Sequence, residues 1–96
     1  MPPVNYRVSQ SQAVTDSLRA IIERARSQGR LRLVVEASRY MIDELAYDPL
    51  HFGESRRFRH AAKIWERLAF CPPLSVRFGV HEDSKQVFIF QIGMSR

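Results

Sequence analysis

The stretch LSVRFGVHEDSKQVFIFQI (Leu74–Ile92) decides the fold, because it contains two apolar runs separated by a short polar segment, His81–Lys85. In the first run, apolar and polar residues alternate, which is typical of a β-strand with one buried face. The second run, Gln86–Ile92, has almost no polar side, so we expect a central strand covered on both faces. Together the two runs predict a β-hairpin. In its first strand, one face holds Leu74, Val76, Phe78 and Val80, and the other holds Ser75, Arg77, Gly79 and His81.

Two amphipathic helices are expected upstream of this hairpin. The first carries an apolar stripe of Val14, Leu18, Ile21, Ile22 and Ala25, and Gly29 is a natural stop after it. The second carries Leu31, Val34, Val35, Ser38, Met41, Ile42 and Leu45 along one face, and Asp48-Pro49 ends it. A first strand, Val4–Val8, precedes both helices, with Val4, Tyr6 and Val8 facing inward.

The segment between the helices and the hairpin has two interpretations. His51–Glu54 is expected to be a loop, and the basic run Ser55–His60 follows it. Residues 63–70 are expected to form a strand, with Ile64, Leu68 and Phe70 inward and Lys63, Trp65 and Arg67 outward. The alternative is a short helix from Ser55, in which Ala61, Ala62, Trp65 and Leu68 share a face. The strand fits the rest of the chain better, and the order becomes β-α-α-β-β-β in an α+β domain spanning residues 1–96.

Composition excludes several classes of protein. A chain of 96 residues, 45% of them hydrophobic, suits a single globular domain. Without a membrane-spanning run or a signal peptide, we expect a cytoplasmic protein. Cys71 is the only cysteine, and the three histidines are dispersed, so the sequence predicts neither a disulfide nor a metal or cofactor site. Cys71 is expected to be a small buried residue.

The charge favours an anionic partner. Lys and Arg total 15 against 10 acidic residues, for a formal net charge of +5, and only Lys63 and Lys85 are lysines. The planar guanidinium group of arginine matches phosphate and carboxylate groups, so the bias suits nucleic acid or an acidic protein. A solvated basic surface without a partner is the simpler alternative.

Five segments, taken in order, resemble the RelE/ParE superfamily of type II toxin–antitoxin toxins, which are also called plasmid-stabilisation toxins. The resemblance covers nearly the whole chain, through the order and spacing of its segments. They are Tyr6-Arg7-Val8-Ser9, Asp48-Pro49 with Phe52-Gly53-Glu54, Val76–Val80, Glu82-Asp83 and Val87–Gly93.

The resemblance implies a curved, mainly antiparallel four-stranded sheet with the helical hairpin on one face and an open basic face opposite. It further implies growth inhibition by one of two routes. RelE-like members cut mRNA in the ribosomal A site, and ParE-like members poison DNA gyrase. In both, a cognate antitoxin neutralises the toxin. The enzymatic form is a metal-independent mRNA endoribonuclease without a cofactor.

Candidate site residues follow from the expected open face, on which Lys63, Trp65, Arg67, Ser75, Arg77 and His81 would project together. RNA cleavage through the 2′-hydroxyl needs a base, an acid and cations on the phosphate. Lys63, Arg77 and His81, with His60 as a substitute for His81, are the catalytic candidates. The candidates for binding nucleic acid or a partner are Arg56, Arg57, Arg59, Trp65, Arg67 and Arg96.

The chain departs from the RelE cleavage pattern at three places. Trp65 stands where such nucleases carry a second lysine, Ser75 stands where they carry an arginine, and no tyrosine follows Arg96. The cleavage set is therefore incomplete. Two alternatives stay open: a degenerate, non-catalytic member that serves as an interaction module, and a nucleic-acid-binding domain unrelated to toxins.

Overall fold

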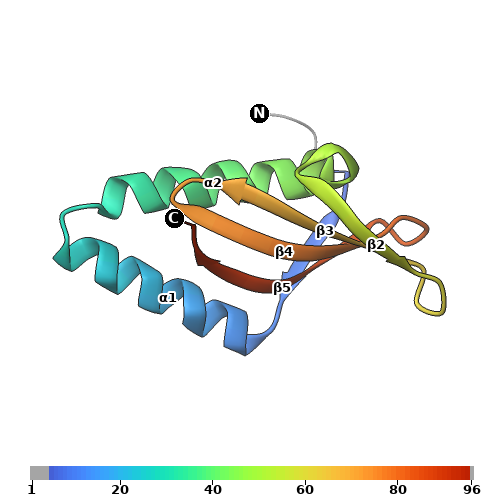
Figure 1. Cartoon of the computed structure of the whole chain (residues 1–96), viewed down its shortest axis with the longest axis horizontal. Coiled ribbons are helices and arrows are strands. Elements are labelled where there is room, and N and C mark those ends of the chain that lie inside the picture. Colours follow the sequence, from blue (N-terminus) through green and yellow to red (C-terminus); the bar gives the residue numbers. More distant parts are fainter. Residues whose placement is uncertain (1–4, 96) are drawn as a thin grey trace.

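The computed structural model describes residues 5–95, in which two helices follow the first strand in the chain and pack on one face of a five-stranded mixed sheet (Figure 1). The strands lie in the order β1-β5-β4-β3-β2, with β1 parallel to β5 and all other pairs antiparallel. The elements are β1 (Arg7–Gln10), α1 (Gln12–Ser27), α2 (Leu31–Tyr47), the 3-10 turn η1 (Pro49–His51), β2 (Glu54–Arg59), β3 (Ile64–Cys71), β4 (Leu74–His81) and β5 (Gln86–Met94). The α+β class is confirmed, but the sheet has five strands, one more than the four expected.

The additional strand is β2, an edge strand formed by the residues expected to be a basic run outside the sheet. In this strand Phe58 lies between Arg57 and Arg59 and points to the opposite face. Phe58 pairs with Trp65 of β3, and Arg59 pairs with Ile64. A bulge between Ser55 and Arg57 shifts the register of the pair. The strand interpretation of residues 63–70 is confirmed, because β3 covers Ile64–Cys71, and the helical alternative is wrong.

Both helices form as their apolar spacing predicts. Ser11 is the N-cap residue of α1, and its hydroxyl accepts a hydrogen bond of 3.3 Å from the backbone N–H of Val14. Gly29 adopts a φ of 72° in the connection to α2. The first strand starts later than expected, at Arg7, and Val4 lies outside the described residues. Tyr6 and Val8 face inward as predicted.

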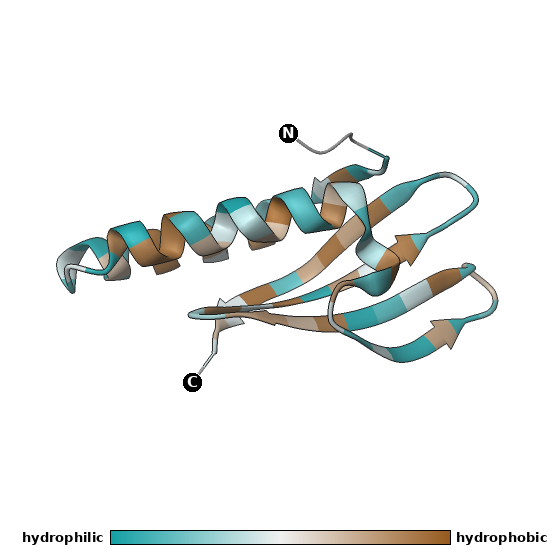
Figure 2. Ribbon diagram, turned by 90° about the horizontal axis from the view of Figure 1, so that it is seen from above, coloured by the Kyte–Doolittle hydropathy of each residue, from teal (hydrophilic) through white to brown (hydrophobic). Residues whose placement is uncertain are grey.

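The core lies between the helices and one face of the sheet. The helical layer lies along one side of the strands, and apolar residues line the space between them (Figure 2). The core side chains with less than 2% exposure include Val34, Met41, Leu45, Leu74, Val76, Phe78, Val80 and Val87. Cys71 is buried with them, and burial, with a smaller effect from the charge of Glu44, raises the pKa of its thiol. No helix within residues 5–95 has the length and apolar character needed to cross a membrane.

The inward face predicted for residues 63–70 is wrong. Cys71 lies opposite Leu74 across the short Pro72-Pro73 turn, and residues opposite each other in antiparallel strands point to the same face. Because Leu74 belongs to the core, Cys71 and every second residue before it point toward the helices. Ala69 and Cys71 are therefore buried, whereas Phe70 is 60% exposed on the other face.

Strand β5 is central, as predicted, but only one of its faces is covered. Val87, Ile89 and Ile92 are buried, whereas Phe90 is 48% exposed. A register shift in the β4–β5 pair places Phe90 at a bulge and Gln91 opposite Arg77. We call the sheet face opposite the helices the open face. Its residues include Arg57, Arg59, Ile64, Glu66, Leu68, Phe70, Ser75, Arg77, Gly79, Phe88, Phe90 and Gln91.

Candidate nucleic-acid interface

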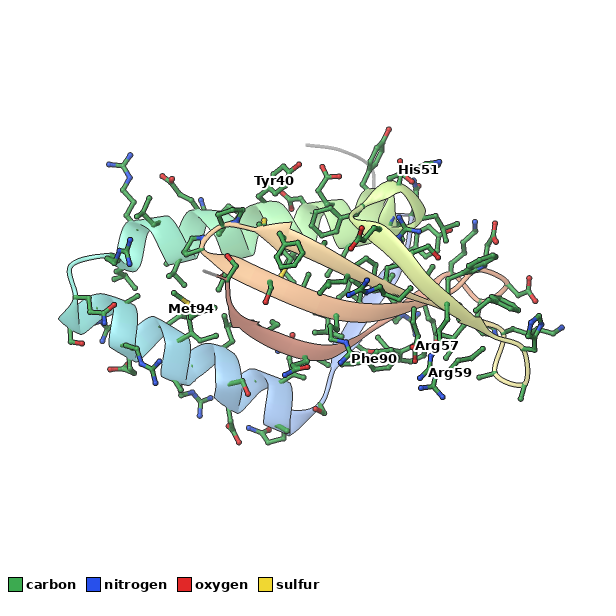
Figure 3. The ribbon with its side chains drawn as sticks, viewed as in Figure 1. Tyr40, His51, Arg57, Arg59, Phe90 and Met94 are labelled. Atoms are coloured by element: carbon green, nitrogen blue, oxygen red, sulfur yellow. The ribbon has the colours of Figure 1, made fainter. Side chains whose placement is uncertain are left out.

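Two arginines bind one carboxylate on the open face and a third lies nearby, and we call Arg57, Arg59, Arg77 and Glu66 the arginine cluster. Arg57 Nε donates a hydrogen bond of 2.8 Å to Glu66 Oε2, and Arg59 Nε donates one to Glu66 Oε1. The two arginines come from β2 and the glutamate from the neighbouring β3, so strand pairing brings them together. Figure 3 places Arg57 and Arg59 side by side, on the same side of the sheet as Phe90.

Glu66 is held in its charged form. Hydrogen bonds from Arg57 and then Arg59 lower the pKa of its carboxyl below the ordinary value of 4.5, against a smaller opposing effect of desolvation. Its side chain is only 12% exposed, whereas Arg57 and Arg59 are 61% and 52% exposed. Glu66 therefore fixes the two guanidinium groups through Nε, while more than half of each arginine side chain stays exposed.

We expect Glu66 to titrate below pH 4.5 in the folded protein. Because the pKa of Glu66 is lower in the folded than in the unfolded protein, its ionised carboxylate stabilises the fold at pH values above the unfolded-state pKa. This stabilisation is lost as the pH falls through the folded-state pKa. NMR titration of the Glu66 carboxyl carbon measures the midpoint directly. In the variant R57A/R59A the midpoint should rise toward the ordinary value, while R56A should leave it unchanged because Arg56 pairs with Glu54. Equal midpoints in wild type and R57A/R59A would contradict this assignment.

Arg77 adds the third cation of the cluster. It lies opposite Leu68 on β3 and Gln91 on β5, and it is exposed. Within residues 5–95, no carboxylate approaches Arg77 to ion-pairing distance, because Glu66 on the neighbouring strand pairs with the two β2 arginines. A shallow hollow of about 500 Å³ is lined by Arg59, Glu66, Arg77, Phe90 and Gln91. This hollow has the charge and the exposed donors to bind a phosphate or carboxylate group.

Two predicted members of the open face lie on the helix-facing side. Trp65 is opposite Val80 and Arg67 is opposite Phe78, so both share the face of the core residues of β4. Arg67 donates hydrogen bonds of 3.0 and 2.8 Å to the backbone carbonyls of Phe52 and Gly53. It thereby ties the connection between η1 and β2 to β3. The shared face expected for Lys63, Trp65, Arg67, Ser75, Arg77 and His81 is therefore wrong for Trp65 and Arg67, whereas Ser75 and Arg77 do lie on the open face.

Trp65 belongs to a small aromatic group at one end of the sheet. Its ring lies 4.5 Å from that of Phe58, whose ring lies 4.9 Å from that of His60. Lys63 is in the adjacent β2–β3 turn with a φ of 55°, and its Nζ is 3.8 Å from Asp83 Oδ2 in the β4–β5 turn. These two turns project at the same end of the sheet (Figure 1).

The remaining candidates are dispersed. His81 ends β4, and its Nδ1 lies 2.5 Å from Ser84 Oγ in the following turn. Arg77 and His81 are four residues apart on this strand, which corresponds to about 13 Å. Arg56 sits at the bulge of β2 and pairs with Glu54 at 3.6 Å. Arg96 lies outside the described residues. The structure thus unites Arg57, Arg59 and Arg77, and it leaves Lys63 and His81 elsewhere.

The sequence interpretation missed four members of this site: Glu66, Gly79, Phe90 and Gln91. A Cβ atom on Gly79 would lie 2.6 Å from Ile64 Cγ2 and 2.7 Å from Phe90 Cζ, so these side chains meet above the bare backbone of Gly79. The usable signal was the alternation of Arg57, Phe58 and Arg59, which is typical of a strand. Among the described residues, no group of His, Cys, Asp and Glu is arranged to hold a metal ion.

No family model, curated protein or solved structure matches the chain.

Proposed function

We propose that this protein is a growth-inhibiting toxin of the RelE/ParE kind that binds RNA through its open face and is neutralised by a cognate antitoxin. The observation that carries the proposal is the arginine cluster, in which Glu66 fixes Arg57 and Arg59 beside an Arg77 free of any described carboxylate. The succession of one strand, two helices and an antiparallel sheet supports the same family.

The cluster favours RNA because its charge and shape suit a phosphate backbone. The three arginines of the cluster carry three positive charges against the single negative charge of Glu66, which leaves a local excess of positive charge on an exposed surface. Arginines already held by a neighbour lose less side-chain freedom when they bind phosphate, so binding is stronger than for mobile side chains. The exposed aromatic side chain of Phe90, which lines the same hollow, offers a stacking surface for an unpaired base.

The geometry supports binding more than cleavage. Transfer of a proton from a 2′-hydroxyl requires a base within hydrogen-bond reach of the same nucleotide whose phosphate is neutralised, about 3 Å. His81 lies at the far end of β4 from Arg77, and Lys63 lies in a turn beside Asp83. Inhibition by occupying an RNA target is therefore the mode that we propose, with endoribonuclease activity as the outcome that would revise it.

The test compares two triple variants that remove the same charge. R57A/R59A/R77A removes the cluster, while R19A/R26A/R32A removes three exposed helix arginines. Under tight induction, wild type and the helix variant should arrest growth, and the cluster variant should not. Binding of purified protein to single-stranded RNA should weaken at least a hundredfold in the cluster variant, and the slope of log affinity against log salt should fall by about 2.

Arrest by the cluster variant at equal protein level would overturn the assignment of the open face. RNA fragments that appear only when wild type is induced would show that the protein inhibits growth by cleaving RNA instead of by binding it. A second candidate function, a non-catalytic interaction module, is favoured by the separation of Lys63 and His81 from Arg77. It predicts normal growth with folded wild-type protein, and binding to RNA or to a protein without arrest.

A further inference from the structure

A second hollow of about 500 Å³ adjoins the arginine cluster on the open face. It is lined mainly by Ile64, Phe88 and Phe90, with Ser9 of β1 and Ser11 of the β1–α1 connection at one side. These residues come from three parts of the chain, because β1 pairs with β5 and Ile64 reaches over from β3. The hollow is apolar in its walls and polar at one rim.

Phe90 forms the wall between the two hollows. Its side chain lines both the apolar hollow and the basic hollow that contains Arg59 and Arg77. The ring lies above Gly79, where any larger residue would collide with it. Phe90 follows the buried Ile89 on β5, so it points to the open face, where it is 48% exposed. The strand thus displays an aromatic surface between an apolar space and a set of cations.

We propose that the apolar hollow holds one unpaired nucleobase, stacked against Phe90, while an adjoining phosphate of the same strand binds Arg59 and Arg77. This inference rests on the proposed function, since it names the form of RNA that the open face takes. A planar base needs an aromatic or aliphatic wall and a few polar groups at its edge, and Ser9 and Ser11 supply hydroxyls there. A base inside a duplex is stacked and paired, so the site selects single-stranded RNA.

The adjoining charges favour a nucleotide over an apolar peptide. Of the charged residues that line the two hollows, Arg59 and Arg77 are cationic and Glu66 is already engaged by arginines. A segment bound across Phe90 must therefore carry negative charge immediately beside a flat apolar group. The repeating base and phosphate of a single strand have this alternation at every residue.

The experiment measures fluorescence anisotropy of a labelled single-stranded octauridylate with the full chain. The comparison probes are an octamer of identical backbone without bases, a labelled RNA hairpin, and an acidic peptide with one tryptophan. For wild type, we expect octauridylate to bind at least tenfold more tightly than the other three probes. F90A should lower affinity for octauridylate about tenfold and leave binding of the baseless octamer unchanged. F90W should restore affinity.

The matched control is F70A, because Phe70 is also exposed on the open face but lines neither hollow. It should bind octauridylate like wild type. Unchanged salt dependence in F90A, with retained binding of the baseless octamer, shows that the variant is folded and that its phosphate contacts persist.

Three results would overturn the nucleobase site. If wild type binds octauridylate and F90A binds it equally well, the base does not contact Phe90, although the proposed function stands. If wild type binds the baseless octamer as tightly as octauridylate, only phosphates are recognised. If none of the RNA probes binds wild type, the proposed function fails together with this inference, and binding of the acidic peptide would then assign the face to a protein partner.

Discussion

Replacement of Phe78 by alanine should lower the free energy of unfolding by about 3–5 kcal/mol. Phe78 has no exposed surface, and its ring stacks on Phe52 at 5.9 Å with an interplanar angle of 27°. The cavity would open between the sheet and the segment after α2, where rigid strands limit collapse. Since small domains are stable by about 5–15 kcal/mol, this loss is a large share of the total.

Urea denaturation followed by the fluorescence of Trp65, the single tryptophan, measures the effect. The matched control is F70A, which removes the same side chain from a position that is 60% exposed on the neighbouring strand. It should change stability by no more than about 0.5 kcal/mol. Comparable losses in F78A and F70A would contradict the assignment of the two sheet faces.

Patterns with one buried face were read correctly from the sequence. The stripe of α1 and the alternation of β4 each contain large apolar residues on one side and polar residues on the other, so burial follows directly from periodicity. Val14, Ala25, Val76 and Val80 are accordingly buried. Cys71 is buried as well, as expected for a single cysteine in an apolar segment.

Patterns with apolar residues on both faces misled the interpretation. In β3, Ile64, Leu68 and Phe70 are the more apolar set, but they lie on the open face because the two-residue turn after Cys71 fixes their direction. That constraint was available: Leu74 faces the core, so Cys71 opposite it must do so too. Periodicity alone cannot decide which of two apolar faces the helices cover.

The candidate site was predicted in part for the same reason. Arg57, Arg59 and Arg77 were recognised by charge, but their convergence depends on the pairing of β2 with β3 and on Glu66 between them. Phe90 was assigned to a strand covered on both faces, because apolar residues on both sides of a strand do not show that the helices cover only one of them. Long-range register, rather than residue type, is what the sequence interpretation lacked.

Replacement of Gly53 by alanine should lower the free energy of unfolding by at least about 3 kcal/mol, as the sum of two costs. Gly53 has a φ of 72°, a conformation that an L side chain rarely adopts. An added Cβ would also collide with the backbone oxygen of Leu68 and lie 2.8 Å from Ala69 Cα, both in β3. The backbone of β3 cannot move aside without breaking its pairing.

Gly29 provides the matched control, because it has the same φ of 72° but nothing within 4 Å of an added Cβ. G29A should therefore cost only the conformational strain, about 1 kcal/mol. The difference between the two variants in urea denaturation isolates the contact with β3. Arg67 donates to the carbonyls of Phe52 and Gly53, so displacement of residue 53 should also weaken these bonds, and R67A should lower stability less in the G53A background than in wild type. Equal costs for G53A and G29A would mean that η1 and β2 do not pack against β3 as described.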